Sequence, residues 1–351
     1  MTAGQAPRVR ELTERELAAI AEVISRAGVV VVGQLNSEFI AGGRSNLTYV
    51  LTDGVARWVM RMPPGVGRTP SAHDVAREYR VTAALSGTGV PVARAVALCE
   101  DESILGGPFA VAEFVQGRTV QTRDELDGLD DANVAAVSRS LVETLAALHR
   151  VDHMAVGLKT FGRPDAYAER QVRRWSSQWA LVGAAALRPL AAALASRLAA
   201  SIPVQRSTGI VHGDYRIDNT ILDLDQAAGP RVAAVVDWEL STIGDPVADV
   251  AMMCVYRNAV FDLIVGAPSA WTSPRLSNPA ALAETYEAAG GVTLVDWDFH
   301  RALACFKIGV IAAGIDHRAR AGAASGPGFD TAGEAVATYL ELGLESLDGR
   351  S

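Results

Sequence analysis

Three groups of polar residues follow one another between residues 210 and 249, and their types suit chemistry on a phosphate group. In the first group, Asp214 follows His212, and Asn219 stands five residues after that aspartate. A carboxylate can accept a proton from an attacking hydroxyl, and an asparagine offers the kind of oxygen that magnesium binds. The spacing therefore indicates a loop that brings a proton acceptor and a metal ligand together.

The second and third groups come later in the same stretch. Asp237 directly follows residues 232–236, an apolar run that predicts a strand. The tripeptide Gly-Asp-Pro at residues 244–246 comes next, and Asp249 lies three residues beyond it. Asp237 is thus a second candidate magnesium ligand, held on a loop at the end of a strand.

The composition indicates a globular protein with a sizeable core. The 351 residues are 49% hydrophobic and 21% charged, enough for two domains. The formal net charge of −8 argues against general binding to nucleic acid. The most apolar window, residues 181–200, is interrupted by arginines and a proline, and residues 1–20 lack the apolar run of a signal peptide. We therefore expect a cytoplasmic protein without a membrane span.

Lysine and cysteine are both scarce. The chain has only two lysines, Lys159 and Lys307, so arginine supplies the other 30 of the 32 basic residues. The three cysteines, at positions 99, 254 and 305, are scattered and lack the spacing of metal ligands. We expect them to be reduced thiols in the core.

The first 115 residues carry the signals of a β-rich domain. Apolar and β-branched runs predict strands at residues 29–35, 47–52, 58–62 and 108–115, with a further β region from residue 90. Capping signatures formed by Thr13 with Glu16 and by Ser71 with Asp74 predict two helices, which glycines at 28 and 87 would end.

The pattern becomes helical after residue 116. Apolar residues at helical spacing predict helices at residues 130–149, 165–200, 246–256, 279–289, 297–313 and 331–344, interrupted by the β-loop stretch described above. The chain is therefore expected to be an α+β protein with two lobes, residues 1–115 and residues 116–351.

Two sites in the first lobe could contact a nucleotide. Gly42 and Gly43 permit a tight turn, so the amides of residues 43–46 and the Ser45 hydroxyl could face a phosphate; an ordinary Gly-Gly hairpin turn is an equal alternative. Residues 113–117 end the last strand, where exposed backbone could bond an adenine edge; the alternative is a plain strand followed by a turn.

Taken together, the motifs resemble the aminoglycoside phosphotransferase and choline kinase-like family, a small-molecule branch of the protein-kinase fold. The segments that carry the resemblance are GGRSN, VMRMPP, REYR, VAEFVQG, HGDYRIDN, VVDWE and GDPVAD. HGDYRIDN and DWELSTIGDP are most similar to the branch whose domain is fused to acyl-CoA dehydrogenases in animals. The resemblance implies a bilobal kinase-like fold with a β-rich N-lobe and a helical C-lobe.

The resemblance also implies roles for the polar groups. Asp214 would be the base or orienting carboxylate for the acceptor hydroxyl, and Asn219 and Asp237 would bind magnesium. His212 and Asp249 would hold the catalytic loop rather than take part in proton transfer.

Further implied roles fall in the N-lobe. The phosphates would be covered by four consecutive residues, Gly43, Arg44, Ser45 and Asn46. The nucleobase would lie near Glu113 and Val115. Arg61 stands where kinases carry a strand lysine, with Glu78 as its expected partner. An arginine can bind phosphate through two parallel hydrogen bonds, but it is not equivalent to lysine. The alternative, on residue type alone, is that Arg61 is an ordinary arginine of an edge strand and Glu78 an ordinary solvated residue of a helix.

The short segment after Asp237 indicates a small acceptor. Only eleven residues separate Asp237 from Asp249, too few for the activation segment on which protein kinases bind a peptide. We therefore predict a kinase that uses magnesium to transfer the ATP γ-phosphoryl group to a hydroxyl of a metabolite, and a hydroxyacyl compound is one candidate. GTP is an equally acceptable donor on sequence grounds, and the oligomeric state is open.

Two other functions remain as alternatives. One is an antibiotic phosphotransferase acting on an aminoglycoside or macrolide, and the other is a nucleotide-binding protein without catalysis. The joint presence of Asp214, Asn219 and Asp237 argues against a nucleotide-binding protein without catalysis. An aminoglycoside pocket should be lined with carboxylates, whereas a set of arginines and tryptophans in the second lobe favours an apolar or anionic acceptor. The alternative is that these residues merely lie at the surface. The set is Arg170, Arg173, Arg174, Arg257, Arg318, Arg320, Trp175, Trp179 and Trp271.

Overall fold

The computed structural model describes residues 10–40, 46–63, 74–226, 229–322 and 326–350. The chain forms two compact units. The N-terminal unit contains Gln5–Gly117 together with Ala233–Ser241, and the C-terminal unit contains Arg118–Val232 and Thr242–Ser351. The segment 233–241, which the sequence placed with the second lobe, therefore packs with the first unit.

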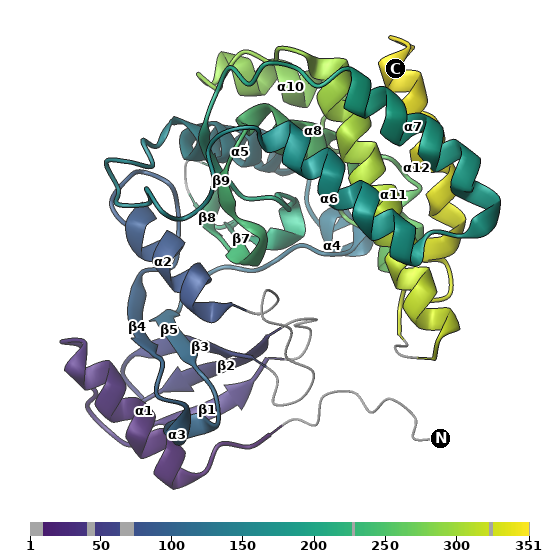
Figure 1. The fold of residues 1–351 in the computed structure, drawn as a ribbon. Helices are drawn as coiled ribbons and strands as arrows, with labels where there is room; N and C mark the ends of the chain where they lie inside the picture. The colour runs from purple at the N-terminus through teal and green to yellow at the C-terminus, as the bar shows by residue number, and fades with distance from the viewer. Residues whose placement is uncertain (1–9, 41–45, 64–73, 227–228, 323–325, 351) are drawn as a thin grey trace. The chain divides into compact units, whose positions relative to one another are not determined.

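A five-stranded antiparallel sheet forms the centre of the N-terminal unit (Figure 1). Its strands, in the spatial order β1-β2-β3-β5-β4, are β1 (Asn36–Phe39), β2 (Leu47–Thr52), β3 (Arg57–Met62), β4 (Ala95–Cys99) and β5 (Phe109–Glu113). Side chains alternate along β3, so Trp58, Met60 and Met62 are buried in the core and Arg61 points to the opposite face.

Three helices complete this unit: α1 (Glu14–Arg26), α2 (Val75–Leu85) and α3 (Glu102–Leu105). A capping box between Thr13 and Glu16 begins α1, as the sequence predicted, and Ile20 and Ile24 pack into the core on its buried face. The side chain of Asp74 accepts a hydrogen bond from the amide of Arg77 and begins α2.

The strand predicted at residues 29–35 was wrong, because the first strand begins at Asn36. Pairing of β1 with β2 starts with Asn36 opposite Thr52, which is the last residue of β2. Within the described part of the chain, the residues before Asn36 have no partner strand, and Val30 and Val32 are 78% and 67% exposed. A β-branched run becomes a strand only where a neighbouring strand can pair with it.

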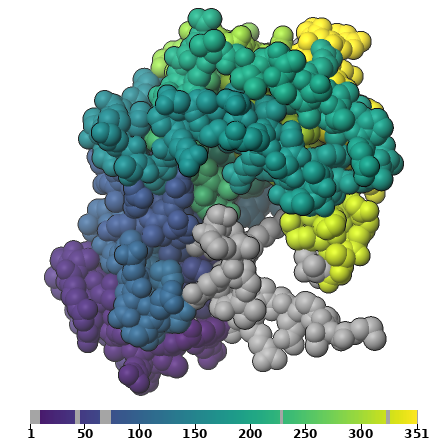
Figure 2. Space-filling model, in the orientation of Figure 1, coloured from purple at the N-terminus to yellow at the C-terminus, as the bar shows by residue number. Residues whose placement is uncertain are grey.

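The C-terminal unit is mainly helical. Its helices are α4 (Arg123–Asp127), α5 (Asp131–Arg150), α6 (Tyr167–Val182), α7 (Arg188–Ala200), α8 (Pro246–Val255), α9 (Phe261–Val265), α10 (Pro279–Ala288), α11 (Trp297–Arg320) and α12 (Ala332–Leu347). The long helix α11 packs against α12, α8 and α6. In the space-filling view, a teal segment that includes α6 and α7 forms much of the visible surface of this unit (Figure 2). None of the helices in the described part of the chain is long and apolar enough to cross a membrane.

The single helix predicted at residues 165–200 is two helices. α6 ends at Val182, a 3-10 turn (η1, Ala185–Leu187) follows, and α7 begins at Arg188 with Pro189 in its first turn. Proline lacks an amide hydrogen and clashes with the preceding turn, so it is tolerated at the start of a helix and not inside one.

Four short strands carry the loops with the predicted polar groups. β6 (Gly209–Val211) pairs with β9 (Thr242–Gly244), and β7 (Thr220–Asp223) with β8 (Arg231–Val235). The first loop, residues 212–219, leaves β6 and ends in a 3-10 turn (η2, Ile217–Asn219). A second 3-10 turn (η3, Trp238–Leu240) lies between β8 and β9.

Candidate active site

The loop after β6, residues 212–219, is called the catalytic loop below. It turns sharply at Gly213, whose φ of 84° lies in the left-handed region that glycine adopts without strain. His212 before it is fully buried, and its Nδ1 accepts a 3.3 Å hydrogen bond from the amide of Asp214. The turn leaves the side chain of Asp214 only partly buried, at 19% exposure.

Asp249 holds this loop from behind. It lies in the first turn of α8, and its carboxylate accepts hydrogen bonds from the amides of His212 at 2.6 Å and Gly213 at 2.8 Å. The ring of His149 lies 3.3 Å from the same carboxylate and 2.8 Å from the Tyr286 hydroxyl. Burial acts to raise the pKa of Asp249, but the contacts with His149 and His212 outweigh it and lower that pKa. The carboxylate therefore stays ionised while it fixes the loop.

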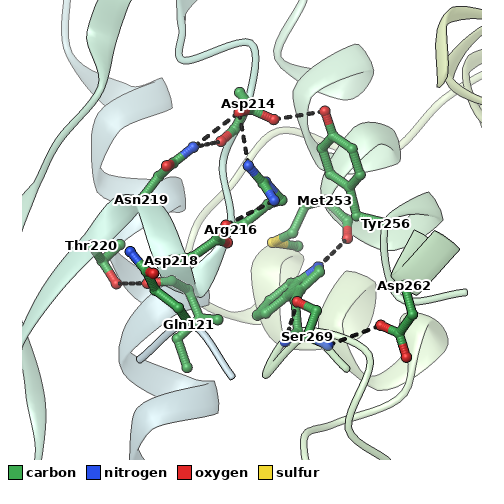
Figure 3. Close-up of polar contacts among 12 residues, drawn as sticks. Gln121, Asp214, Arg216, Asp218, Asn219, Thr220, Met253, Tyr256, Asp262 and Ser269 are labelled. Carbon is green, nitrogen blue, oxygen red and sulfur yellow. Dashed lines mark hydrogen bonds and ion pairs between the residues drawn. The ribbon is translucent and has the colours of Figure 1, made fainter. Parts of the chain in front are cut away.

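Three donors converge on the carboxylate of Asp214 (Figure 3). The Tyr256 hydroxyl donates to Oδ1 at 2.6 Å, and Oδ2 accepts from Asn219 at 3.0 Å and from Arg216 at 3.1 Å. Burial acts to raise the pKa of Asp214, but Arg216 first, then Tyr256 and Lys307, more than offset it and lower that pKa. The carboxylate is therefore ionised at neutral pH and held in one orientation.

The orientation of Asn219 follows from its contacts. Its amide nitrogen donates both to Oδ2 of Asp214 and, at 2.7 Å, to the backbone carbonyl of Asp214. Because the nitrogen faces Asp214, the side-chain oxygen points away from that carboxylate (Figure 3). An amide oxygen presented in this way fits the hard-oxygen donor set that magnesium requires.

Arg216 and Tyr256 were missed by the sequence analysis. The Arg216 guanidinium forms ion pairs with Asp214 and Asp218, the latter at 2.8 Å, and lies 5.1 Å and 5.2 Å from the ring centres of Tyr256 and Phe261. Arg216 stands two residues after Asp214 in the same motif, and that proximity was an available signal. Tyr256 is 42 residues from Asp214, and nothing in the local sequence links the two.

Lys307, on α11, was also missed. Its ammonium donates to the carbonyl of Gly213 at 2.8 Å and lies 5.9 Å from the centre of the Trp175 ring. Burial lowers the pKa of Lys307, while Asp214 and Asp249 oppose that shift. Beside it is a small cavity, whose lining includes Tyr167, Gln171, Trp175, Met252, His300 and Leu303.

A second polar cluster lies within the N-terminal unit. Nη1 of Arg61 is 2.7 Å from the carboxylate of Glu78, so the expected pair forms, and Nη2 is 3.4 Å from Oδ1 of Asp237. Asn46 donates to the other oxygen of Glu78 at 3.1 Å. Asp237 adopts a left-handed backbone with φ 62° and ψ 58°, a conformation that aspartate tolerates better than most residues.

This second cluster brings three carboxylates close together. Glu78, Asp237 and Glu239 each offer a carboxylate oxygen within 4.8 Å of the others. Burial foremost raises the pKa of Glu78 to about 7, and Asp237 and Glu239 add to the rise while Arg61 opposes it. Such a set of carboxylates can hold a divalent cation. Glu239 was not among the predicted ligands, although it stands two residues after Asp237.

The remaining predicted nucleotide contacts lie in two places. Gly43, Arg44 and Ser45 fall outside the described residues. Glu113 ends β5 and forms an ion pair with Arg94 at 2.5 Å, and the half-buried Val115 follows it.

Several of the arginines and tryptophans that favoured an anionic acceptor have structural roles or lie at the surface. Arg257 donates to the backbone carbonyls of Ser273, Leu276 and Ser277, so it braces a loop. Trp271 is fully buried. Four of the arginines are exposed to solvent, namely Arg173, Arg174, Arg318 and Arg320. Most of these residues are therefore structural or at the surface.

A five-stranded sheet followed by a helical unit with such a loop defines a phosphotransferase of protein-kinase-like fold, and comparisons with known proteins agree. Residues 37–303 match the model of the phosphotransferase enzyme family. A crystal structure of a candidate aminoglycoside phosphotransferase from Ralstonia eutropha JMP134 is 35% identical, with a TM-score of 0.81, and the match covers 95% of this chain and 98% of that one. The chain belongs to the phosphotransferase enzyme family.

Two curated relatives extend the comparison. The chain is 34% identical over 304 residues to acyl-CoA dehydrogenase family member 10 of Mus musculus, and 32% identical over 280 residues to family member 11 of Homo sapiens. These matches cover 86% and 79% of this chain but 28% and 35% of the relatives, so the chain spans about a third of their length. Both the predicted family and its acyl-CoA dehydrogenase-linked branch are confirmed.

The second solved structure supports the fold alone. A thermostable mutant of aminoglycoside phosphotransferase APH(4)-Ia, in a ternary complex with AMP-PNP and hygromycin B, shares the fold with a TM-score of 0.60 and 17% identity. The match covers 93% of this chain and 98% of that one. The predicted α+β, kinase-like fold class is confirmed.

Proposed function

We propose that this protein is a small-molecule kinase that transfers the γ-phosphoryl group of ATP to a hydroxyl of a metabolite. The observation that carries the proposal is the Asp214 carboxylate. It is ionised and partly exposed, and three donors hold it in one orientation on the catalytic loop. A non-catalytic nucleotide-binding protein would have no need for a carboxylate held in this way.

In the proposed reaction, Asp214 orients the acceptor hydroxyl and receives its proton. Asn219 and Asp237 are the proposed magnesium ligands, and Glu239 is a further oxygen donor close to Asp237. The cation, when bound, would neutralise charge on the transferred phosphoryl group. Asp249 and His212 keep the catalytic loop in place.

Arg61 is proposed to position the phosphates. Its contact with Glu78 fixes one edge of the guanidinium, as a lysine–glutamate pair does in kinases. The nucleotide would be covered by residues 43–46, and its base would lie near Glu113 and Val115. ATP is the proposed donor, and a direct comparison with GTP tests that choice.

The acceptor is proposed to be a hydroxylated metabolite, with a hydroxyacyl compound as the first candidate. The two curated relatives at more than 30% identity carry the name of acyl-CoA dehydrogenases, which supports an acyl-type acceptor. The second candidate is an antibiotic, because one solved structure with the same fold is a complex with hygromycin B and another is a macrolide 2′-phosphotransferase. Those two structures are only 17% and 22% identical to this chain, but the 35% identical structure from Ralstonia eutropha also carries the name of an aminoglycoside phosphotransferase.

A nucleotide-consumption assay tests both candidates. The purified protein would be supplied with magnesium and ATP, or GTP, and a panel of aminoglycosides, macrolides, choline, sugars and hydroxyacyl-CoA compounds. Asp214→Ala is the control that should remove turnover. We expect turnover with a hydroxyacyl compound; turnover with an antibiotic alone would favour the second candidate. Binding of nucleotide without turnover of any acceptor would contradict a kinase function.

A further inference from the structure

The contacts of Asp214 leave one place for an acceptor. An ionised carboxylate has about four positions at which it accepts hydrogen bonds, two on each oxygen. On Oδ2, Asn219 and Arg216 occupy both positions, at 3.0 Å and 3.1 Å. On Oδ1, Tyr256 occupies one, at 2.6 Å. Among the donors in the described part of the chain, these contacts leave the second position of Oδ1 for a substrate.

From this geometry we propose that the acceptor hydroxyl docks on Oδ1 of Asp214, beside the Tyr256 hydroxyl, and that Tyr256 is a positioning residue for phosphoryl transfer. The inference rests on the proposed function and names the atom that receives the acceptor. Tyr256 touches the proposed base rather than the reacting groups, so it acts through Asp214.

Tyr256 is well held for this role. It directly follows α8, its amide donates to the carbonyl of Met252, and only 5% of the residue is exposed. The centre of its ring lies 4.8 Å from that of Phe261 and 5.1 Å from the guanidinium of Arg216. These contacts direct the hydroxyl at Oδ1 (Figure 3).

The tyrosine can only donate. Burial and the neighbouring Asp214 raise the pKa of Tyr256 well above its ordinary value, so the phenol keeps its proton at neutral pH. In the proposed step, the acceptor O–H bond breaks and its proton passes to Oδ1 of Asp214. The acceptor oxygen forms a bond to the γ-phosphorus, and the bond from that phosphorus to the bridging oxygen breaks, releasing the nucleoside diphosphate.

The test is Tyr256→Phe, which removes one hydroxyl. The control is Tyr49→Phe, because Tyr49 is a buried tyrosine of the N-terminal unit whose hydroxyl donates to the Arg10 carbonyl at 2.8 Å. We expect kcat of Tyr256→Phe to fall about tenfold or more, the scale of one hydrogen bond to a charged group, with KM for ATP unchanged.

A second measurement does not depend on finding the acceptor. The affinity for ATP, measured by calorimetry, should stay at the wild-type value in both Tyr256→Phe and Tyr49→Phe, so that a fall in kcat reports on Asp214 rather than on nucleotide binding.

The outcomes distinguish a failure of the role of Tyr256 from a failure of the proposed kinase function. A kcat that stays at the wild-type value in Tyr256→Phe would overturn the role of the tyrosine, even if Asp214→Ala is inactive. Wild-type turnover in Asp214→Ala would overturn the proposed function itself.

Discussion

The two polar clusters of this protein balance their charges in opposite ways. In the C-terminal unit, Asp214 is surrounded by the cations of Arg216 and Lys307 and by the Tyr256 hydroxyl, and its pKa is lowered. In the N-terminal unit, Arg61 pairs with Glu78 and Asp237, Glu239 lies close to both carboxylates, and the pKa of Glu78 is raised to about 7.

The difference separates a site that is complete as it stands from one that could hold a cation. The first cluster can accept a hydrogen bond from an incoming hydroxyl without rearrangement, which is the preorganisation that catalysis requires. In the second, Asp237 and Glu239 help to raise the pKa of Glu78, and either a proton on Glu78 or a bound divalent cation would relieve the repulsion among the three carboxylates. The predictions below test this contrast, starting with the largest effect.

Replacement of Asp214 by Asn should have the largest effect. The amide keeps the shape of the side chain but cannot take a proton, so we expect kcat to fall by roughly 10²–10⁴-fold, the usual contribution of a general base. Nucleotide affinity, measured by calorimetry, should change little. The surface variant Asp223→Asn on the adjacent strand β7 is the control. A near-wild-type rate would show that the first cluster is not the reacting one.

Replacement of Asp237 by Asn should remove the response to magnesium. Wild-type protein should be stabilised by MgCl₂ in thermal unfolding, by about 2.7 kcal/mol at a hundred times the dissociation constant. The variant should lose most of that gain because it lacks a proposed ligand. Glu22→Gln, at an exposed position on α1, serves as the control. Equal stabilisation of all three proteins would refute the view that the second cluster binds a cation.

The titration of Glu78 should make stability depend on pH. Its folded-state pKa of about 7 lies above the ordinary value of 4.5, so its contribution to stability is complete below pH 4.5 and is lost as the pH rises towards 7. In magnesium-free urea unfolding, the free energy of unfolding of Glu78→Gln should gain roughly 1–2 kcal/mol relative to wild type across that interval. A constant difference between the two proteins would mean that Glu78 does not titrate there.

Replacement of Lys307 by Met should have the smallest effect on turnover. Methionine keeps the length and apolar stem of lysine but leaves the Gly213 carbonyl without its donor, which should cost on the order of 1–3 kcal/mol of stability. The catalytic loop should remain in place because Asp249 still holds it, so we expect kcat to fall only several-fold. Lys159→Met, which changes the exposed second lysine, is the matched control. Complete loss of activity in a folded Lys307→Met protein would give this residue a larger role.

Much of the fold could be predicted from the sequence because its signals are local. The Thr13 capping box and the alternation along β3 each occupy fewer than ten residues, and both appear in the structure. The motif containing Asp214 and Asn219 is equally local, so their proximity followed from spacing alone. Prediction failed at residues 29–35, where the outcome depended on whether a partner strand was available.

The parts of the site that could not be predicted are contacts between distant segments. Tyr256 and Lys307 reach the catalytic loop across 42 and 94 residues, and each looked like an ordinary helix residue. Similarly, the roles of Arg257 and Trp271 depended on which side of a helix or loop faces the core. Hydrophobic periodicity predicts that a face is buried, but it does not say which polar partner meets it.

The contacts of Asp249 also bear on how the protein acquires activity as it folds. This carboxylate joins segments that are 100 and 37 residues away in the chain, at His149 and His212. Helices such as α5 and α11 depend on local hydrogen bonds, whereas contacts between distant segments form only after long loops have closed. Refolding chains should therefore regain their helical signal before they regain turnover, so that recovered activity marks completion of the native topology.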